Sequence, residues 1–351
     1  MENIVCFGEI MLRVSPWEKS KRIFQTNNFL IEPAGSESNV AINLANLGQK
    51  TTFLSAIPNN NLGKIILKYL NKYRVNTSFL IEKKNSRLGI FWNENGVDLR
   101  ASYVIYDRKK SAFSITNYED YEWAKIEKNM TWFHTSGITA ALNKSTYTML
   151  ENTLSKIKQA NIPISIDLNY RDKLWDWVSA DKNIQIPELM KKICLNVTLL
   201  CGNEEDFQKC LGTDSNKELN NIVALYTDIA SQVFEIMPNL KYLAVSLRKS
   251  ISASINDWSG LLFTKKDDKL EVYKGNNYHL TNIVDRVGGG DSFCAGIIYG
   301  LINKKFDYQY IIDFATTFSA LKHTIRGDIA EFSVIDVEKT IEMQFIGKML
   351  R

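Results

Sequence analysis

The chain has 351 residues, of which 45% are hydrophobic and 23% are charged, an ordinary composition for a globular protein. Its formal net charge of +4 is too small to indicate binding to nucleic acid or to a membrane. The five cysteines are odd in number and scattered, and neither they nor the three histidines have metal-ligand spacing, which argues against a disulfide framework and against a zinc site. With no secretory signal, we expect a cytoplasmic protein.

In chain order, short apolar strands alternate with amphipathic helices. The first strand, 4–7, is too short and too charged in its surroundings to span a membrane. Further strands are expected at 52–57, 131–135, 162–168, 198–201 and 242–246. Helices are expected at 39–47, 62–73, 147–160, 222–236, 291–302, 308–324 and 337–345. This alternation predicts a mostly parallel sheet with helices on both faces.

Two stretches, about 12–34 and 88–114, are strand-like and interrupt the alternation. One interpretation is a peripheral hairpin of structural value only. The other is a small β-sheet lid over the crevice at the carboxyl ends of the strands, where open α/β sheets bind ligands. We find no repeat and no long linker, so one domain over 1–351 with a lid fits better than two domains.

Three glycines, Gly288, Gly289 and Gly290, lead directly into Asp291 and an apolar helical run. Glycine lets the backbone come close to a ligand, and the start of a helix offers unpaired N–H groups to an anion. A carboxylate beside that anion is placed to act as a general base on a hydroxyl. The spacing matches neither a P-loop nor a dinucleotide fingerprint. A strand–helix turn with Asp291 as a helix-capping acid remains the simpler alternative.

The segment 285–296, with its pattern D-x-x-G-G-G-D-x-F-x-A-G, resembles the second signature of the ribokinase/PfkB carbohydrate kinase family. The stretch 35–41, followed by Gly48, resembles the first signature, and the Phe7-Gly8-Glu9 opening also matches. Four further runs are similar to those of bacterial 2-dehydro-3-deoxygluconate kinases: 104–108, 165–171, 202–206 and 320–324. The resemblance therefore covers nearly the whole chain.

The resemblance implies a ribokinase-like three-layer αβα sandwich with a small β-sheet lid. It also implies ATP-dependent phosphorylation of 2-dehydro-3-deoxy-D-gluconate at its 6-hydroxyl, giving 2-dehydro-3-deoxy-6-phosphogluconate. Asp291 would be the general base, and the loop from Gly288 to Asp291 would be the anion hole. Mg²⁺ would accompany the nucleotide. Two lids would pair in a homodimer, which fits apolar lid residues such as Ile90, Trp92, Val104 and Tyr106, expected to be exposed.

The remaining site residues divide between the two substrates. For the sugar we expect Gly35, Asn39, Tyr106, Arg108 and Arg171. The two arginines matter most, because guanidinium forks bind carboxylates and a neutral sugar does not need them. For the nucleotide the resemblance implies Asn169, Asn203, Ser246, Arg248 and Lys322, and it implies that Asp206 contacts the metal through water.

Two departures from the family pattern concern the phosphate side. Asp206 stands where the family has a longer Glu, and Arg286 stands where the family has Thr. Two other functions therefore stay open. One is a neutral-sugar kinase of the fructokinase or ribokinase type, and the other, less favoured because the Gly-Gly-Gly-Asp run is intact, is a non-catalytic sugar-acid-binding protein.

Overall fold

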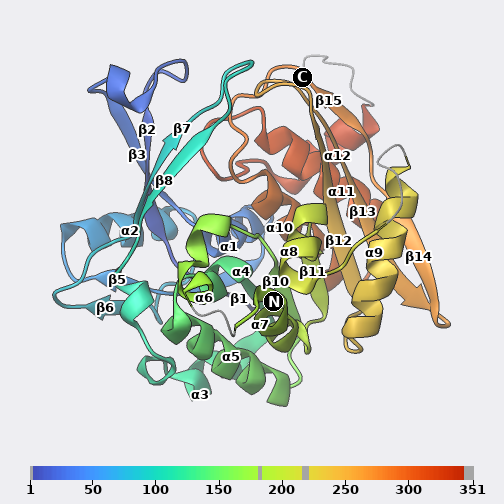
Figure 1. Cartoon of the computed structure of the whole chain (residues 1–351), viewed down its shortest axis with the longest axis horizontal. Coiled ribbons are helices and arrows are strands. Elements are labelled where there is room, and N and C mark those ends of the chain that lie inside the picture. Colours follow the sequence, from blue (N-terminus) through green and yellow to red (C-terminus); the bar gives the residue numbers. More distant parts are fainter. Residues whose placement is uncertain (1–2, 181–183, 216–220, 344–351) are drawn as a thin grey trace.

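The computed structural model describes residues 3–180, 184–215 and 221–343 (Figure 1). The strands of its main sheet are β1 (Asn3–Phe7), β4 (Lys50–Leu54), β9 (Met130–Ser136), β10 (Ile164–Asp167), β11 (Leu199–Gly202), β12 (Tyr242–Ser250), β13 (Asn256–Lys266), β14 (Lys269–Lys274) and β15 (Tyr278–Leu280). Their order is β14-β13-β12-β11-β10-β9-β1-β4, and β15 pairs with β13. From β4 to β12 neighbouring strands are parallel, whereas β13 pairs antiparallel with all of its neighbours.

Helices cover both faces of this sheet, so the body has three layers (Figure 1). One face packs against α1 (Ser36–Asn46), α2 (Asn61–Lys72), α10 (Gly289–Ile302), α11 (Tyr308–Lys322) and α12 (Val334–Glu342). The other face packs against α3 (Trp123–Ile126), α4 (Gly137–Ala141), α5 (Lys144–Gln159), α6 (Asp176–Ser179), α7 (Ile186–Cys194), α8 (Glu204–Leu211) and α9 (Ile222–Ile236).

Strand β1 shows why the central strands are apolar throughout. Ile4 and Cys6 belong to the apolar cluster on one face, while Val5 and Phe7 belong to the cluster on the other. Because successive side chains of a strand point to opposite faces, a parallel strand between two helical layers needs an apolar residue at every position. The mostly parallel sheet expected from the sequence is therefore confirmed.

A second, smaller sheet projects from one side of the body (Figure 1). Its strands are β2 (Met11–Pro16), β3 (Phe29–Ala34), β7 (Ile90–Glu94) and β8 (Tyr103–Asp107), in the order β3-β2-β7-β8. They come from the two stretches that interrupt the alternation, and we call this sheet the lid. Two short strands, β5 (Ala56–Pro58) and β6 (Ile81–Lys83), pair beside the body.

Several expected boundaries were wrong. The strand expected at 52–57 is divided between β4 and β5, and the helix expected at 39–47 begins earlier, at Ser36. The helix expected at 291–302 begins at Gly289. The last helix, expected at 337–345, spans Val334–Glu342, and the end of the expected range lies outside the described residues.

The lid exposes different apolar side chains from those expected. Ile90, Trp92, Val104 and Tyr106 are all partly buried. The exposed apolar residues of the lid strands are Ile31, Tyr103 and Ile105. For Val104 and Tyr106 the difference follows from the strand alternation, which turns them toward the cavity and their neighbours on the same strand outward.

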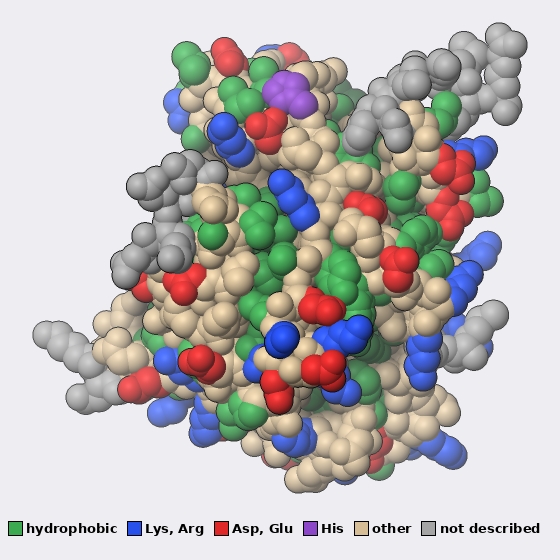
Figure 2. Space-filling view, turned by 90° about the vertical axis from the view of Figure 1, so that its right-hand side faces the viewer, with side chains coloured by type: hydrophobic (Ala, Val, Ile, Leu, Met, Phe, Trp, Pro, Cys, Tyr) green, Lys and Arg blue, Asp and Glu red, His purple; other side chains and the backbone are tan. Residues whose placement is uncertain are grey.

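Among the described residues, no helix has the length and apolar character that crossing a bilayer requires. On the face seen in Figure 2, basic and acidic side chains are interspersed, with apolar side chains between them.

Candidate active site

A cavity of about 580 Å³ lies where the carboxyl ends of β10, β11 and β12 meet the inner face of the lid. Its size is typical of a small-molecule site, and its place is where open α/β sheets bind ligands. Fourteen of the expected site residues line it: Gly35, Asn39, Tyr106, Arg108, Asn169, Arg171, Asn203, Asp206, Ser246, Arg248, Gly288, Gly289, Gly290 and Asp291.

Asp291 lies in the first turn of α10, and its carboxylate is buried. Ser36 Oγ donates a hydrogen bond to one carboxylate oxygen and Asn39 Nδ2 donates to the other, both at 2.7 Å. Burial raises the pKa of Asp291 to about 6, while these two hydrogen bonds lower it. The carboxylate is thus ionised near neutral pH yet basic enough to accept a proton, as a general base must be.

The glycine loop presents backbone N–H groups next to this carboxylate. Gly288 has a φ of +81° and is the N-cap of α10, so the N–H groups of the following residues have no partner within the helix. A Cβ at Gly288 would overlap the carbonyl oxygen of Asp328, whereas a Cβ at Gly290 would have no heavy atom within 4 Å. Close packing therefore requires glycine at 288, and the loop is open at 290.

The entry to α1 also depends on close packing. A Cβ at Gly35 would overlap the carbonyl oxygen of Glu9. Gly35 is the N-cap of α1, and no side chain caps this helix among the described residues. Ser38 Oγ instead donates to the Gly35 carbonyl at 2.9 Å. Asn39 directs its amide nitrogen to Asp291, which leaves its buried Oδ1 without a partner among the described residues.

Arg108 reaches the cavity from the end of β8, but it is already paired. Its Nε and Nη2 donate to Oε2 of Glu9 at 2.8 and 2.6 Å, and both side chains are buried. Tyr106 lies two residues earlier on the same lid face. The Arg108 guanidinium therefore keeps only part of its donor capacity for a ligand.

Three other arginines on the cavity wall lack such a partner. Arg171, Arg248 and Arg286 have no carboxylate within ion-pair distance among the described residues. Burial, followed by repulsion from Arg286 and Arg171, lowers the pKa of Arg248. Such concentrated positive charge is suited to a polyanion such as a triphosphate.

Two buried carboxylates, Asp167 and Asp206, also line the cavity. Burial raises the pKa of Asp167 well above its usual value, and the nearby charges of Asp206 and Asp291 raise it further. Asp206 accepts hydrogen bonds from the backbone N–H groups of Tyr170 and Asn203 at 2.8 and 2.9 Å. In return, Asn203 Oδ1 accepts from the Asp206 N–H, completing a capping box at the start of α8.

Lys322 is the exception among the expected site residues. It is fully buried, donates to the backbone carbonyl of Asp285 at 2.9 Å, and does not line the cavity. The position of this side chain does not fit the nucleotide contact expected from the sequence, and that expectation is corrected. Its neighbour His323 does line the cavity beside Trp258, and burial lowers its pKa to about 4, so its ring is neutral.

Sequence reasoning missed the role of Ser36 and the partner of Arg108. Ser36 holds Asp291 and in turn accepts a hydrogen bond from Asn169 Nδ2 at 3.0 Å. The polar run that carries Ser36 was visible in the sequence, but its contact with Asp291 joins residues 255 positions apart. Glu9 and Arg108 are 99 positions apart.

Comparisons with known proteins agree with this geometry. The model of the pfkB family carbohydrate kinases matches residues 1–234. The crystal structure of 2-dehydro-3-deoxygluconokinase from Thermotoga maritima superposes with a TM-score of 0.89 at 38% identity, covering 97% of this chain and 100% of that one. A PfkB family carbohydrate kinase from Listeria grayi gives a TM-score of 0.87 at 30% identity, with 97% and 100% coverage.

A curated relative extends the comparison to another sugar acid. The 2-dehydro-3-deoxygalactonokinase of Haloferax volcanii is 26% identical over 339 residues, which is 97% of this chain and 96% of that one. The family match, the ribokinase-like fold and the cavity with its buried Asp291 and glycine loop all agree. The chain therefore belongs to the pfkB family of carbohydrate kinases and is a sugar kinase.

Proposed function

We propose that this protein transfers the γ-phosphoryl group of ATP to the 6-hydroxyl of 2-dehydro-3-deoxy-D-gluconate. The products are ADP and 2-dehydro-3-deoxy-6-phosphogluconate. The observation that carries the proposal is the buried Asp291 carboxylate, with a pKa raised to about 6, beside the free N–H groups of the glycine loop. Asp291 faces a cavity that is also lined by arginines without an ion-pair partner in the part of the chain that the structure describes.

In the proposed reaction, Asp291 accepts the proton of the sugar hydroxyl as its oxygen forms a bond to the γ-phosphorus. The bond from that phosphorus to the bridging oxygen of ADP breaks, and its electron pair leaves with ADP. The N–H groups of Gly289, Gly290 and Asp291 stabilise the negative charge on the transferred group. Phosphoryl transfer depends mainly on such positioning and electrostatics.

The sugar acid is proposed because of the arginines and the names of the relatives. Arg171 lines the cavity, and its charge lowers the pKa of Asp291, so its guanidinium is near the base. A guanidinium there would bind the carboxylate of a sugar acid. The named kinases of Thermotoga maritima and Haloferax volcanii act on 2-dehydro-3-deoxy sugar acids. The nucleotide would lie on the side of Asn203, Ser246 and Arg248.

The residues on the cavity wall fit a magnesium ion carried by the nucleotide. Asp167 and Asp206 are buried acids whose pKa values are raised by burial, and in Asp167 also by neighbouring carboxylates. A divalent cation would offset that repulsion, and carboxylates are the ligands that Mg²⁺ prefers, directly or through water. When bound, Mg²⁺ would neutralise charge on the nucleotide phosphates. We assign Asp206 a contact through water, because backbone N–H groups already occupy each of its oxygens.

One observation favours a second candidate. Because Glu9 already pairs with Arg108, one of the two arginines expected to bind a carboxylate is largely neutralised. A neutral-sugar kinase of the fructokinase or ribokinase type needs no such carboxylate contact, and this pairing is compatible with it.

A coupled assay of ADP release across sugar acids and neutral sugars decides between these functions. We expect turnover on 2-dehydro-3-deoxy-D-gluconate and little on fructose or ribose. The Arg171→Ala variant should raise KM for the acid by about 10- to 100-fold, the loss expected for a charged hydrogen bond. Equal rates on fructose and the acid would establish the neutral-sugar alternative. If no sugar causes release of ADP, the remaining function is that of a non-catalytic sugar-acid-binding protein.

We also propose a homodimer formed through the outer face of the lid, and a cytoplasmic location, where ATP is available. The dimer proposal rests on the apolar residues that the lid exposes, Ile31, Tyr103 and Ile105. A sheet face that exposes several apolar side chains is commonly covered by a protein partner.

A further inference from the structure

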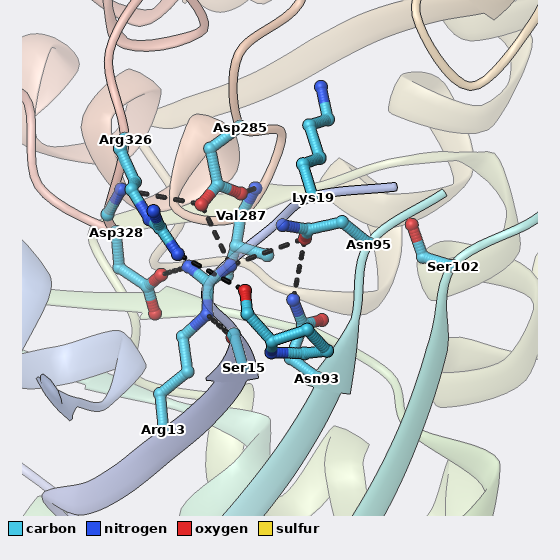
Figure 3. A network of polar contacts seen from close by, with 12 residues as sticks. Arg13, Ser15, Lys19, Asn93, Asn95, Ser102, Asp285, Val287, Arg326 and Asp328 are labelled. Atoms are coloured by element: carbon cyan, nitrogen blue, oxygen red, sulfur yellow. Dashed lines mark hydrogen bonds and ion pairs between the residues drawn. The ribbon is translucent and has the colours of Figure 1, made fainter. Parts of the chain in front are cut away.

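A buried ion cluster joins the lid to the glycine loop (Figure 3). At its centre is Arg13 of lid strand β2, whose side chain is fully enclosed. Its Nη2 donates to Asp285 Oδ2 at 2.8 Å, its Nη1 pairs with Asp328, and its Nε donates to Ser15 Oγ at 3.1 Å. Neither sequence patterning nor the proposed reaction gives Arg13 a role.

Both carboxylates that Arg13 binds belong to the framework of the loop. Asp285 also accepts from the N–H groups of Val287 at 3.2 Å and Gly327 at 3.3 Å. The backbone carbonyl of Asp328 packs against Gly288 so closely that a Cβ there would overlap it. The guanidinium thus binds two segments that adjoin the turn at the start of α10. One carries Asp285, which precedes the turn in the chain, and the other carries Asp328, whose carbonyl packs against Gly288.

On the other side, Arg13 is linked to the lid surface that faces the cavity. Its Nη2 also donates to Asn95 Oδ1 at 3.4 Å, and the same oxygen accepts from Asn93 Nδ2 at 2.7 Å. Asn93 lines the cavity, as does Val287. A continuous polar path therefore runs from the lid through Arg13 and Asp285 to the loop (Figure 3).

The charges of the cluster balance. Arg13 and Lys322 are buried cations, and Asp285 and Asp328 are buried anions. Burial alone would lower the pKa of Arg13, but the two carboxylates outweigh it and raise the pKa. An ion pair with so little access to water is held in one geometry, and removing one member leaves an uncompensated charge.

We propose that Arg13 is a positioning residue of the lid, which holds the glycine loop in the conformation that presents its N–H groups to the transferred phosphoryl group. Through Arg13, the position of the lid over the sugar and the geometry of the loop are coupled. The proposal rests on the proposed kinase reaction for its effect on rate, but its effect on loop order is independent of that reaction.

The test compares Arg13→Met with a matched lid control, Glu94→Gln. Glu94 is buried on β7, where it accepts from Arg22 Nε and from the Ile23 N–H, both at 3.0 Å, and it has no contact with the loop. Kinetics on 2-dehydro-3-deoxy-D-gluconate and amide hydrogen exchange are measured on both variants and on the unaltered protein. Circular dichroism establishes that each variant is folded.

For Arg13→Met we expect kcat to fall by about 10- to 100-fold, because a small misplacement of an anion hole costs that much. KM for the sugar should stay within about threefold, since the hydrogen-bond partners of Arg13 within the described residues include none of the residues proposed to hold the sugar. The amides of 287–291 should exchange at least about tenfold faster, with those of β10 and β11 unchanged. Glu94→Gln should match the unaltered protein in every measurement.

If Arg13→Met does not fold, Arg13→Met/Asp328→Asn replaces it, because this pair removes one charge of each sign and leaves the charge of Asp285 near that of Lys322, whose pKa it raises. A folded variant with unaltered loop exchange and kcat overturns the proposal, and so does an equal loss of kcat in Glu94→Gln. Should the unaltered protein phosphorylate no sugar, the proposed function fails. The exchange measurement then still decides whether Arg13 orders the loop.

Discussion

The carboxylate of Asp291 is stabilised less well by the fold than by water. Its pKa rises from 3.8 to about 6 on burial. A carboxyl group with a raised pKa in the folded state favours folding when protonated and opposes it when ionised. The penalty is absent below about pH 4 and fully present above about pH 6, and it corresponds to up to about 3 kcal/mol.

Replacing Asp291 with Asn should therefore abolish most turnover and stabilise the protein. We expect kcat to fall at least about 10²- to 10⁴-fold, the usual contribution of a general base. At pH 8 the free energy of unfolding should rise by about 1–3 kcal/mol, because the charge is removed and an amide still accepts one of the two hydrogen bonds. Urea denaturation measures this change.

Asp268→Asn, at an exposed turn, serves as the control and should change neither activity nor stability. Retained turnover in Asp291→Asn would contradict the assignment of the base. A loss of stability at pH 8 would contradict the raised pKa.

The same pKa predicts the pH dependence of the reaction. Because the base must be unprotonated, kcat/KM should fall as the pH drops below about 6. The hydrogen bond from Ser36 lowers the pKa of Asp291, so Ser36→Ala should move the acid limb of the profile to higher pH. Ser38→Ala is the control, because Ser38 donates to the Gly35 carbonyl and not to Asp291. An acid limb that does not move, or moves to lower pH, would count against this role for Ser36.

At the scale of single elements, the start of α10 combines two glycines with opposite requirements. Gly288→Ala places a Cβ against the Asp328 carbonyl at a φ of +81°, and we expect a loss of about 2–4 kcal/mol in unfolding free energy. Gly290→Ala adds a methyl group in open space within the first turn of the helix, and it should gain up to about 1 kcal/mol. Equal stabilities in urea denaturation would refute this distinction.

The sequence predicted those elements whose signals are local. Helix 222–236 was found at its observed bounds, and the parallel strands were located by their apolar runs. Strands β13 to β15 were missed, because their positions depend on antiparallel pairing with β12 and with one another. Within β13, Gly260 interrupts the strand pattern because Phe293 of α10 fills the space of its side chain.

In the candidate site, too, the sequence predicted the features that depend on neighbouring residues and missed those that depend on distant ones. The spacing from Gly288 to Asp291 is local, and it predicted the glycine turn at the start of α10 and the carboxylate beside it. Arg108 was recognised as a charge, but the sequence does not show that Glu9 neutralises it. Lys322 was assigned to the nucleotide on the family resemblance, whereas its side chain is buried and donates to the backbone carbonyl of Asp285. Partners that lie far apart along the chain decide what each charged residue does.

At the scale of the whole molecule, the outer face of the lid carries one apolar row across its strands. In the register of the sheet, Ile31 pairs with Val14, Val14 with Trp92, and Trp92 with Ile105. Ile31 is 58% exposed and Ile105 is 44% exposed. The row is suited to packing against the same row of a second copy.

Ile105→Lys should therefore convert the proposed dimer into a monomer of 40.2 kDa, because it places a charge in the contact. Sedimentation velocity at micromolar concentration measures the species present. Ile251→Lys alters an equally exposed isoleucine outside the lid and should leave the dimer intact. A 40.2 kDa species in the unaltered protein would contradict the dimer itself.

The pairing of Ser36 and Asn39 with Asp291 has a consequence for synthesis on the ribosome. After these two residues are made, more than 250 further positions must be added before the base appears. At about 5–20 residues per second, this takes on the order of 10–50 s. During that interval α1 lacks α10, a helix that it packs against in the folded protein. The nascent chain therefore cannot place its proposed catalytic base, Asp291, against Ser36 and Asn39 until α10 has been synthesised.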